Sequence, residues 1–401
     1  MVQIKMYPAK NGDCFLISLG EIEKKHILID CGYIDTYENF LKRDLVKIAE
    51  CNEKINLMIV THIDSDHISG AIKFIEDNNK NKFIEIDEVW FNAYRHLQSF
   101  KKDEDELQEI EKDLLEREIA LGKSHLNRYN RDEITKDEIS AKQGSTLGAL
   151  LLQGNYNWNG KFNGGPVVSK DNKPIYIDEI KINLLSPDED KLNKLEAKWV
   201  KELKKKKWNF TINKNELFDD AYEYMQMMYE DDSNITVSDI SRQSQEGTKI
   251  LEESIEIEFP IDESVNNGSS IAILIKSNET KLLFLADAHP NIIIDKLREI
   301  GEENFDLVKV SHHGSLKNTN YELASNLQST KYLFSTNGFK HLHPDPQTII
   351  KLLAANPMCE KQLYFNYKTE TSNIFESTEL QNKYNYKIIT GNGEMPIVIE
   401  L

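Results

Sequence analysis

The 401-residue sequence lacks long apolar runs and contains few cysteines. No stretch approaches the roughly 18–20 uninterrupted apolar residues that a membrane-spanning helix needs, and the start of the chain shows no pattern typical of a secretion signal. The four cysteines, Cys14, Cys31, Cys51 and Cys359, form no C-x-x-C pair, so we interpret them as buried thiols rather than as a disulfide framework. We therefore expect a cytoplasmic protein that does not contact a membrane.

Basic residues are also scarce relative to acidic ones. The chain has 67 acidic and 49 basic residues, which gives a formal net charge of −18. Such a balance argues against a protein that coats nucleic acid without sequence preference, but it leaves room for a local basic patch. With 39% hydrophobic and 29% charged residues, the composition is that of an ordinary globular protein.

Strand-like patterns occur at both ends of the chain and flank a charged, mostly helical middle. We expect residues 1–96 and 263–401 to form the two halves of one two-sheet domain, and residues 97–262 to be a large insertion with a strand at 179–187. A hairpin turn is expected at Asn278-Glu279, between two apolar runs.

A dense polar cluster follows the apolar run 55–61, which has the pattern of a strand buried on both faces. It contains His62, Asp64, Asp66 and His67 within six residues. Two imidazoles and two carboxylates at the end of a buried strand are costly to place together unless a cation gathers them, and these ligands suit Zn, Mn or Fe. The alternative is a polar loop in which Asp66 caps a helix expected over 69–79.

Two later motifs lead to the same interpretation. Asp287 ends the apolar run 280–288, where its carboxylate could bind cations, or it could cap the helix that follows Pro290. His312 and His313 also follow a strand, and at least one of these imidazoles is expected to face the metal. From the residues alone, either histidine could be the ligand.

The H-x-D-x-D-H motif resembles the signature loop of the metallo-β-lactamase-fold hydrolases, usually written H-x-H-x-D-H. The version with Asp at the second place is similar to the hydrolase domain of the ComEC DNA-uptake channel. Further resemblance lies in the segments 11–17, 27–32, 267–271, 284–288 and 310–315, the last with an HHGS motif. The resemblance implies a four-layer αββα sandwich and a site for two divalent ions, Zn or Mn, with Mg conceivable at the harder position.

The resemblance also implies roles for single residues. Asp66 and His343 would be catalytic, although His343 could instead lie in a surface loop, and Asp30 would orient ligands. Asn267, Ser269 and His96 would contact substrate. From the residues alone, His96 could instead be a metal ligand, and His289, which adjoins Asp287, could simply point outward. The implied metal ligands are His62, Asp64, Asp66, His67, Asp287, His313 and His312, with His313 favoured over His312.

Two positions depart from the usual family pattern. Asp64 and Asn267 stand where most members have histidine, which makes one metal position harder and more open. Such a site suits phosphate oxygens, and the ComEC-like motifs belong to a subgroup associated with DNA degradation. We therefore expect a phosphodiesterase, and in particular a nuclease acting on DNA or RNA.

A basic stretch in the insertion is the weakest support for this function. Lysines 201 and 204–207 lie between Trp199 and Trp208, which could stack on bases, although such a helix is usually only a solvated face. Two other functions stay open: a small-molecule hydrolase acting on a thioester, lactone or cyclic nucleotide, and an effector subunit of a bacterial phage-defence complex. In the second case the Tyr- and Met-rich segment 222–229 could dock a protein partner or cover the site, or it could simply be an amphipathic helix on the core.

Overall fold

The computed structural model describes residues 1–401 except 98–108, 111, 118, 121–145, 206–250 and 357–358. The chain divides into two compact units. Unit 1 comprises Met1–Ile22, Val168–Asp188 and Asp232–Leu401, and unit 2 comprises Glu23–Val167 and Glu189–Asp231.

The main sheet of unit 1 has eight strands among the described residues, in the order β15-β14-β13-β11-β9-β8-β7-β6. Neighbours from β15 to β9 are parallel, whereas β9, β8, β7 and β6 pair antiparallel. The bounds are β6 Ile175–Ile177, β7 Ile180–Ser186, β8 Ala272–Ser277, β9 Thr280–Phe284, β11 Leu307–Lys309, β13 Lys331–Phe334, β14 Lys361–Phe365 and β15 Tyr386–Thr390. The expected turn at Asn278-Glu279 is confirmed, because Ser277 pairs with Thr280 across the β8–β9 hairpin.

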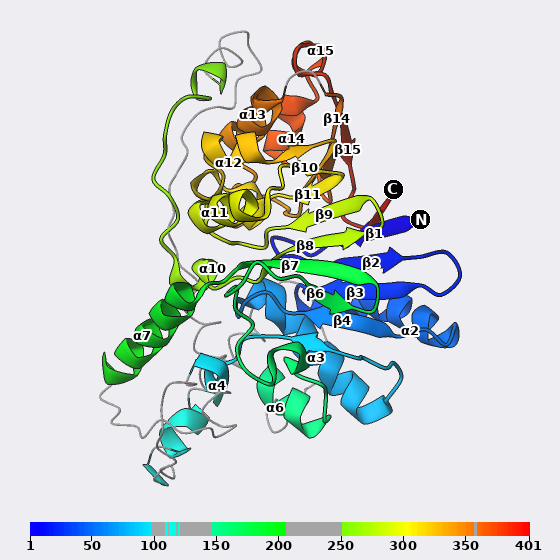
Figure 1. The fold of residues 1–401 in the computed structure, drawn as a ribbon, viewed down its shortest axis with the longest axis vertical. Helices are drawn as coiled ribbons and strands as arrows, with labels where there is room; N and C mark the ends of the chain where they lie inside the picture. Colours follow the sequence, from blue (N-terminus) through cyan, green and yellow to red (C-terminus); the bar gives the residue numbers. More distant parts are fainter. Residues whose placement is uncertain (98–108, 111, 118, 121–145, 206–250, 357–358) are drawn as a thin grey trace. The chain divides into compact units, whose positions relative to one another are not determined.

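Three helices of unit 1 pack against the parallel part of this sheet (Figure 1): α11 (Pro290–Ile300), α12 (Tyr321–Asn326) and α13 (Pro346–Ala355). Their apolar sides form one buried core with the sheet, in which Ile293 of α11 and Ile349 of α13 join Val308 of β11. Other helices of unit 1 include α10 (Val265–Gly268), η4 (Ser311–Gly314), η5 (Leu316–Asn318), α14 (Glu370–Phe375) and α15 (Thr378–Tyr384).

The N-terminal hairpin of unit 1 is tied to the loops that follow β13 and β14. Strands β1 (Val2–Met6) and β2 (Phe15–Leu19) pair antiparallel, and β16 (Ile397–Glu400) pairs with β1. Ser335 Oγ donates to the carbonyl of Gly12 at 2.7 Å, and Asn366 Nδ2 donates to the carbonyl of Tyr7 at 3.1 Å. These bonds hold the β1–β2 turn, which carries Asp13, beside the end of β13. A small parallel pair, β10 (Asn304–Phe305) and β12 (Gln328–Ser329), completes the strands of unit 1.

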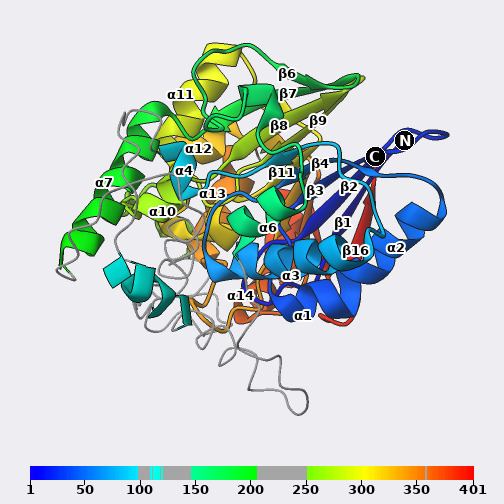
Figure 2. The same cartoon turned by 90° about the horizontal axis from the view of Figure 1, so that it is seen from below.

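Unit 2 is built around three parallel strands, β3 (Lys25–Ile29), β4 (Ile55–Ile59) and β5 (Val89–Trp90). Every residue of β4 is buried, which confirms the interpretation of the apolar run as a strand covered on both faces. Helices α3 and α6 contact each other in unit 2 (Figure 2). The helices of unit 2 include α1 Ile34–Thr36, η1 Tyr37–Leu41, α2 Lys42–Glu50, α3 Ser65–Asn81, α4 Tyr94–Leu97, α6 Leu147–Gln153, η3 Gly160–Phe162 and α7 Glu189–Lys205.

Helix α3 begins four residues earlier than the sequence pattern predicted, at Ser65 rather than near residue 69. Asp66 and His67 therefore lie in its first turn. The N-cap position is Asp64, so the alternative in which Asp66 caps the helix is wrong. The helix can start this close to the strand because it approaches the preceding loop closely at Gly70, whose N–H donates to the carbonyl of Gly32 at 2.8 Å.

The predicted fold class is confirmed: the chain is a mixed α/β protein with several sheets, consistent with the metallo-β-lactamase fold. The cysteine interpretation is half wrong, because Cys14 and Cys31 are buried but Cys51 and Cys359 are exposed. Half of the predicted insertion, including the Tyr- and Met-rich segment 222–229, lies outside the described residues. No helix in the described part combines the length and the apolar character needed to cross a membrane.

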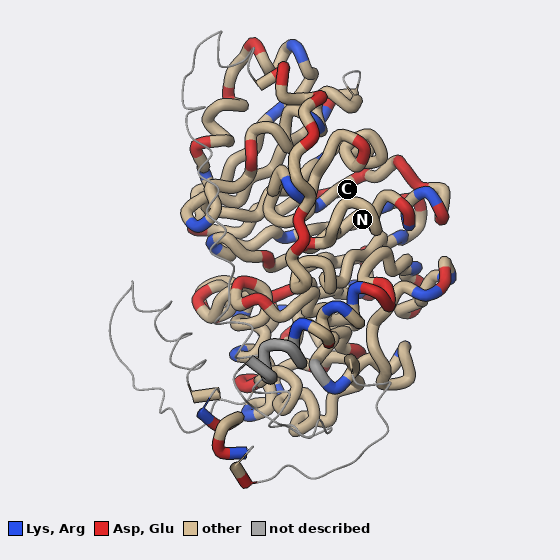
Figure 3. The backbone as a smooth tube through the Cα atoms, turned by 90° about the vertical axis from the view of Figure 1, so that its left-hand side faces the viewer, with Lys and Arg blue, Asp and Glu red and all other residues tan. Residues whose placement is uncertain are grey.

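Acidic and basic residues are interspersed along the described backbone (Figure 3). The predicted basic stretch at 201–207 lies outside the described part of the structure. Residues 206 and 207 are not described, and neither are the side chains of the last turns of α7.

Candidate metal centre

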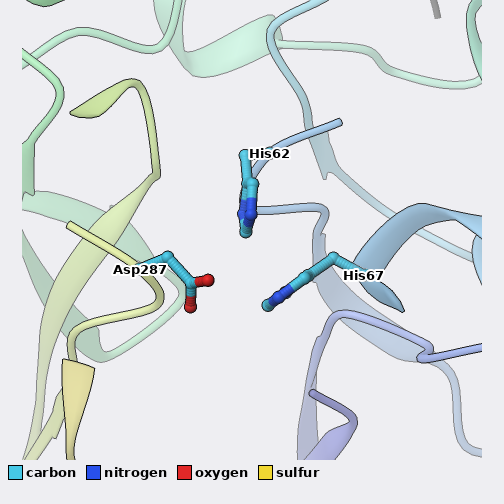
Figure 4. A group of neighbouring side chains, drawn as sticks. All are labelled: His62, His67 and Asp287. Carbon is cyan, nitrogen blue, oxygen red and sulfur yellow. The ribbon is translucent and has the colours of Figure 1, made fainter. Parts of the chain in front are cut away.

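One group of candidate ligands lies in unit 2, where the chain passes from β4 to α3. Two histidines from this connection lie side by side: the ring centroids of His62 and His67 are 4.1 Å apart (Figure 4). Carboxylates accompany them, with Asp64 Oδ2 at 3.6 Å from His62 Nε2 and Asp66 Oδ1 at 3.9 Å from His67 Nε2. Both imidazoles are buried, so the four predicted ligands of this loop do gather within unit 2.

A buried carboxylate at the end of β3 organises this loop. Asp30 is completely buried, and three donors converge on it: Thr61 N at 2.8 Å, Thr61 Oγ1 at 2.7 Å and His67 Nδ1 at 2.8 Å. Because the carboxylate accepts from His67 Nδ1, the proton of that ring lies on Nδ1 and the lone pair lies on Nε2. The structure thus gives Asp30 the orienting contact that the family resemblance implied.

His62 takes the same tautomer through Thr61. The Thr61 hydroxyl has a single proton, which it donates to Asp30, so the oxygen accepts from His62 Nδ1 at 3.1 Å. His62 therefore also presents a lone pair on Nε2. Both rings are thus neutral imidazoles with an unprotonated Nε2, and this is a form in which histidine binds metal ions.

Another group of candidate ligands lies in unit 1, at the carboxyl ends of three neighbouring parallel strands. Asp287 follows β9, the pair His312 and His313 follows β11, and His343 follows β13. Carboxyl ends of parallel strands meet at the same edge of a sheet, where α/β proteins commonly bind ligands. The sheet topology explains why residues up to 56 positions apart meet here.

Both histidines of the HHGS motif expose the same nitrogen. His313 Nδ1 donates to the carbonyl of Ser335 at 2.8 Å, and a carbonyl can only accept. His312 Nδ1 lies 2.9 Å from Oδ1 of Asn318, whose amide nitrogen donates to Asp262. Since that amide oxygen accepts, His312 Nδ1 carries the proton. Each ring therefore has its lone pair on Nε2, and the choice between His312 and His313 stays open.

Asp287 faces these two lone pairs. Its Oδ2 lies 3.7 Å from Nε2 of His312 and 3.7 Å from Nε2 of His313. Three electron-pair donors that converge in a buried place repel one another unless a cation lies among them. The N-cap of α11 is His289, so the alternative role of Asp287 as helix cap is wrong.

Two charged residues that sequence reasoning did not assign lie behind Asp287. Lys309 of β11 is 1% exposed and pairs with the buried Asp13, and its Nζ lies 3.8 Å from Asp287 Oδ1. Asp13 Oδ1 lies 3.4 Å from His313 Nδ1. The signal for Lys309 was a lone charge in the apolar run Leu307–Val310, which is unusual in a central parallel strand.

A third unassigned residue, Asp262, holds the polar groups on the other side of His312. Its Oδ2 accepts from Asn267 Nδ2 at 2.7 Å and from Asn318 Nδ2 at 2.9 Å, and its Oδ1 accepts from Ser264 N at 2.8 Å. Burial acts to raise the pKa of Asp262, but the nearby His312 and these hydrogen bonds outweigh it, so the pKa lies below its ordinary value. The carboxylate thereby orients Asn267, which stands where the usual family has histidine.

Several non-glycine residues of these loops adopt the left-handed backbone conformation. Asp30 has φ 53°, Ala286 has φ 47°, and the consecutive His312 and His313 have φ 45° and 54°. Non-glycine residues in this left-handed region cost about 1–3 kcal/mol each and persist where the surroundings enforce them, often at functional sites. Here the strained positions lie at or next to the candidate ligands.

His343 lies next to His312, with ring centroids 5.5 Å apart, and its Nδ1 is 3.4 Å from Asp345 Oδ2. Burial lowers its pKa, Asp345 acts to raise it, and His312 and His313 add to the lowering, so the pKa lies below the ordinary value of 6.5. The alternative of an exposed surface loop does not describe this side chain, which is 14% exposed. A neutral imidazole beside the site can still donate one hydrogen bond.

Three other predicted residues have mainly structural contacts. Ser269 Oγ donates to the carbonyl of Asn266 at 2.6 Å. His96 is buried against Trp158, and burial together with Arg95 lowers its pKa to about 3. The expectation that His289 points outward is wrong: it is 7% exposed and Nε2 donates to the carbonyl of Ser264 at 2.9 Å. The substrate roles of Ser269 and His96 stay predictions.

The donors in both groups fit a divalent cation. Each group supplies two imidazoles with Nε2 lone pairs and at least one carboxylate, and such mixed sets suit Zn and Mn. The Nδ1 atoms are held by a carboxylate, a hydroxyl, an amide oxygen and a carbonyl, which is how ligating histidines are usually oriented.

Comparison with known proteins agrees with this donor set. Residues 7–131 match the family model of the metallo-beta-lactamase superfamily. The matched segment includes Asp30 and the whole H-x-D-x-D-H loop, and the superfamily is one of metal-dependent hydrolases that usually bind divalent ions. No curated protein matches the chain.

A solved structure of a mutant CmlA beta-hydroxylase is similar to the chain, at 10% sequence identity and a TM-score of 0.38. The match covers 100% of this chain and 54% of that chain, so the chain spans about half the length of the structure it matches.

Proposed function

We propose that the chain is a metal-dependent phosphodiesterase that cleaves nucleic acid with the help of divalent ions bound by its clustered histidines and carboxylates. The supporting observation is the common tautomer of four histidines, His62, His67, His312 and His313, all of which carry the ring proton on Nδ1 and the lone pair on Nε2.

The proposed ions are Zn or Mn, with Mg at the position made harder by Asp64 and Asn267. When bound, such ions lower the pKa of a coordinated water and stabilise charge on a phosphoryl oxygen. The chain's own groups would do the rest. Asp66, at the start of α3, would accept a proton, and His343, neutral and next to His312, would donate a hydrogen bond to the substrate.

Phosphodiesters are favoured over amides and thioesters by the composition of the ligand set. Carboxylate and amide oxygens replace two imidazoles relative to the usual family pattern, and oxygen-rich sites prefer hard cations and phosphate oxygens. The orientation of Asn267 by Asp262 supports a polar role for that amide at the site. The ComEC-like motifs of the sequence lead to the same substrate class.

The test is a nuclease assay on single- and double-stranded DNA and on RNA, with Mn²⁺, Zn²⁺ or Mg²⁺ added to metal-stripped protein. We expect cleavage that depends on metal and that falls at least 100-fold in Asp66→Ala and Asp287→Ala. Asp306→Ala, in the turn before β11, is the matched control and keeps the activity. A fully metal-loaded protein that leaves all three nucleic acids and bis-phosphate model esters intact would refute the proposal.

A further inference from the structure

A lysine is buried among the candidate ligands of unit 1. Lys309 is the last residue of β11, between Val308 and Val310, and it is 1% exposed. Its ammonium group reaches three acceptors: a carboxylate oxygen of Asp13, the carbonyl of Ala286 at 3.2 Å, and Oδ1 of Asp287 at 3.8 Å. A buried ammonium is very costly unless it is paired and hydrogen-bonded, and these three contacts satisfy that requirement.

The ammonium group helps to hold the backbone that presents Asp287. The carbonyl of Ala286 accepts both from Lys309 Nζ and, at 2.8 Å, from the N–H of His312. Ala286 is itself in the left-handed region, and Asn318 Nδ2 donates to the carbonyl of Asp287 at 3.2 Å. Hydrogen bonds to the carbonyls of Ala286 and Asp287 therefore stabilise this turn, and Lys309 donates one of them.

The two oxygens of Asp287 have different surroundings. Oδ2 faces the Nε2 atoms of His312 and His313, each at 3.7 Å, which are electron-pair donors. Oδ1 faces the ammonium of Lys309. On the Oδ1 side the protein therefore already supplies a positive charge, which any divalent ion bound there would have to approach.

Asp13 contributes to this difference between the surroundings of the two Asp287 oxygens. Its charge is matched by Lys309, and its Oδ1 lies 3.4 Å from His313 Nδ1, so this carboxylate is engaged inside the protein. A second divalent ion on the Oδ1 side of Asp287 would meet a fixed like charge a few ångströms away, in a buried and weakly screened place.

We propose that Lys309 acts as a built-in cation of the centre and limits the chain to one tightly held divalent ion, with any second ion bound weakly and exchangeably. The inference rests on the proposed function in requiring a metal centre, but it concerns the number and strength of the ions rather than the substrate. Lys309 is a positioning residue, because it acts through Asp287 and Asp13.

The experiment counts ions and measures their affinities. Metal-stripped protein is loaded with Zn²⁺ or Mn²⁺, dialysed against metal-free buffer and analysed for metal content, and titration calorimetry gives the two dissociation constants. We expect one retained ion per chain in the wild type, with the second ion bound at least 100-fold more weakly than the first. In Lys309→Met, we expect the second dissociation constant to tighten at least tenfold.

Two further variants make the result decisive. Lys351→Met removes another buried lysine of unit 1, which donates to the carbonyl of Ile257, and should leave both constants as in the wild type. If Lys309→Met does not fold because Asp13 loses its partner, the double variant Asp13→Asn with Lys309→Met removes both charges of the pair and carries the same expectation.

The possible failures can be told apart. Two ions held with similar strength in the wild type, or a second constant within threefold of the wild type in the folded Lys309 variants, overturn the role of Lys309 and leave the phosphodiesterase proposal standing. A wild type that binds no ion under any condition overturns both. Loss of nuclease activity with the expected ion count overturns only the substrate assignment.

Discussion

Replacing Asp30 by asparagine tests how the ligand loop of unit 2 is held. Asp30 is fully buried, and its Oδ2 accepts from both Thr61 Oγ1 and His67 Nδ1, whereas Oδ1 accepts from Thr61 N. In Asp30→Asn an amide NH₂ takes the place of one oxygen, so one or two of these bonds are lost and the others lose their charge assistance. Bonds to charged groups contribute about 1.5–3 kcal/mol each, so we expect the free energy of unfolding to fall by about 2–5 kcal/mol.

The same change should weaken metal binding more specifically. Without the carboxylate, His67 is no longer held with its proton on Nδ1, so Nε2 is not reliably the unprotonated ring nitrogen. Loss of such an orienting partner typically costs 10- to 100-fold in metal affinity. Urea unfolding of metal-free protein would measure the change in the free energy of unfolding. Competition with a chromophoric chelator would measure the change in the dissociation constant of the metal.

Asp77→Asn is the matched control for this experiment. Asp77 also lies in unit 2, is 7% exposed and accepts from Lys42, Lys73 and Tyr37, but none of these is a candidate ligand. We expect this variant to lose stability and to bind metal as the wild type does. If Asp30→Asn keeps its metal affinity within threefold of the wild type, or if both variants lose affinity equally, the assigned role of Asp30 is wrong.

Three further predictions follow from buried positions. Gly70→Ala should destabilise the protein by about 1–3 kcal/mol and weaken metal binding, because the added Cβ would lie 2.2 Å from the carbonyl oxygen of Cys31; unchanged unfolding midpoints would contradict this. The free energy of unfolding of His96→Gln should rise relative to that of the wild type by up to about 1.4 kcal/mol per pH unit as the pH falls from 6.5 toward 3. The reason is that His96 stays neutral in the folded protein, where its pKa is about 3, but takes up a proton in the unfolded chain. Urea midpoints at pH 7, 5.5 and 4.5 measure the difference, and an equal pH dependence of variant and wild type would refute it. Asp262→Asn should lower the nuclease kcat at least tenfold, because Asn267 loses its charged acceptor, while the metal content stays unchanged; equal kinetics of variant and wild type would exclude that role.

Much of the local chemistry could be predicted from short stretches of sequence. The apolar run before His62 fixes a buried strand, and a strand of this kind ends at an edge where polar residues meet. The H-x-D-x-D-H and HHGS motifs therefore identified candidate ligands without any knowledge of the fold. The start of α3 was misplaced because Asp66 and His67 look like loop residues when only the polar pattern is considered, whereas the structure places them in the first turn.

The partners that orient these ligands could not be predicted in the same way. Asp262 lies 50 positions before His312 along the chain, and Lys309 pairs with Asp13, which lies near the start of the sequence. Such contacts depend on which strands become neighbours and on the register between them.

The amino-acid sequence by itself determined the fold class, the buried strands and the types of ligand, because hydrophobic periodicity and the clustering of imidazoles and carboxylates are local properties. Only the tertiary structure decided which ring nitrogen of each candidate histidine ligand is unprotonated and which carboxylates lie against the buried ammonium of Lys309. It also decided that His289 is buried rather than exposed. These depend on hydrogen bonds and charges that meet across long stretches of chain, where burial makes each one strong.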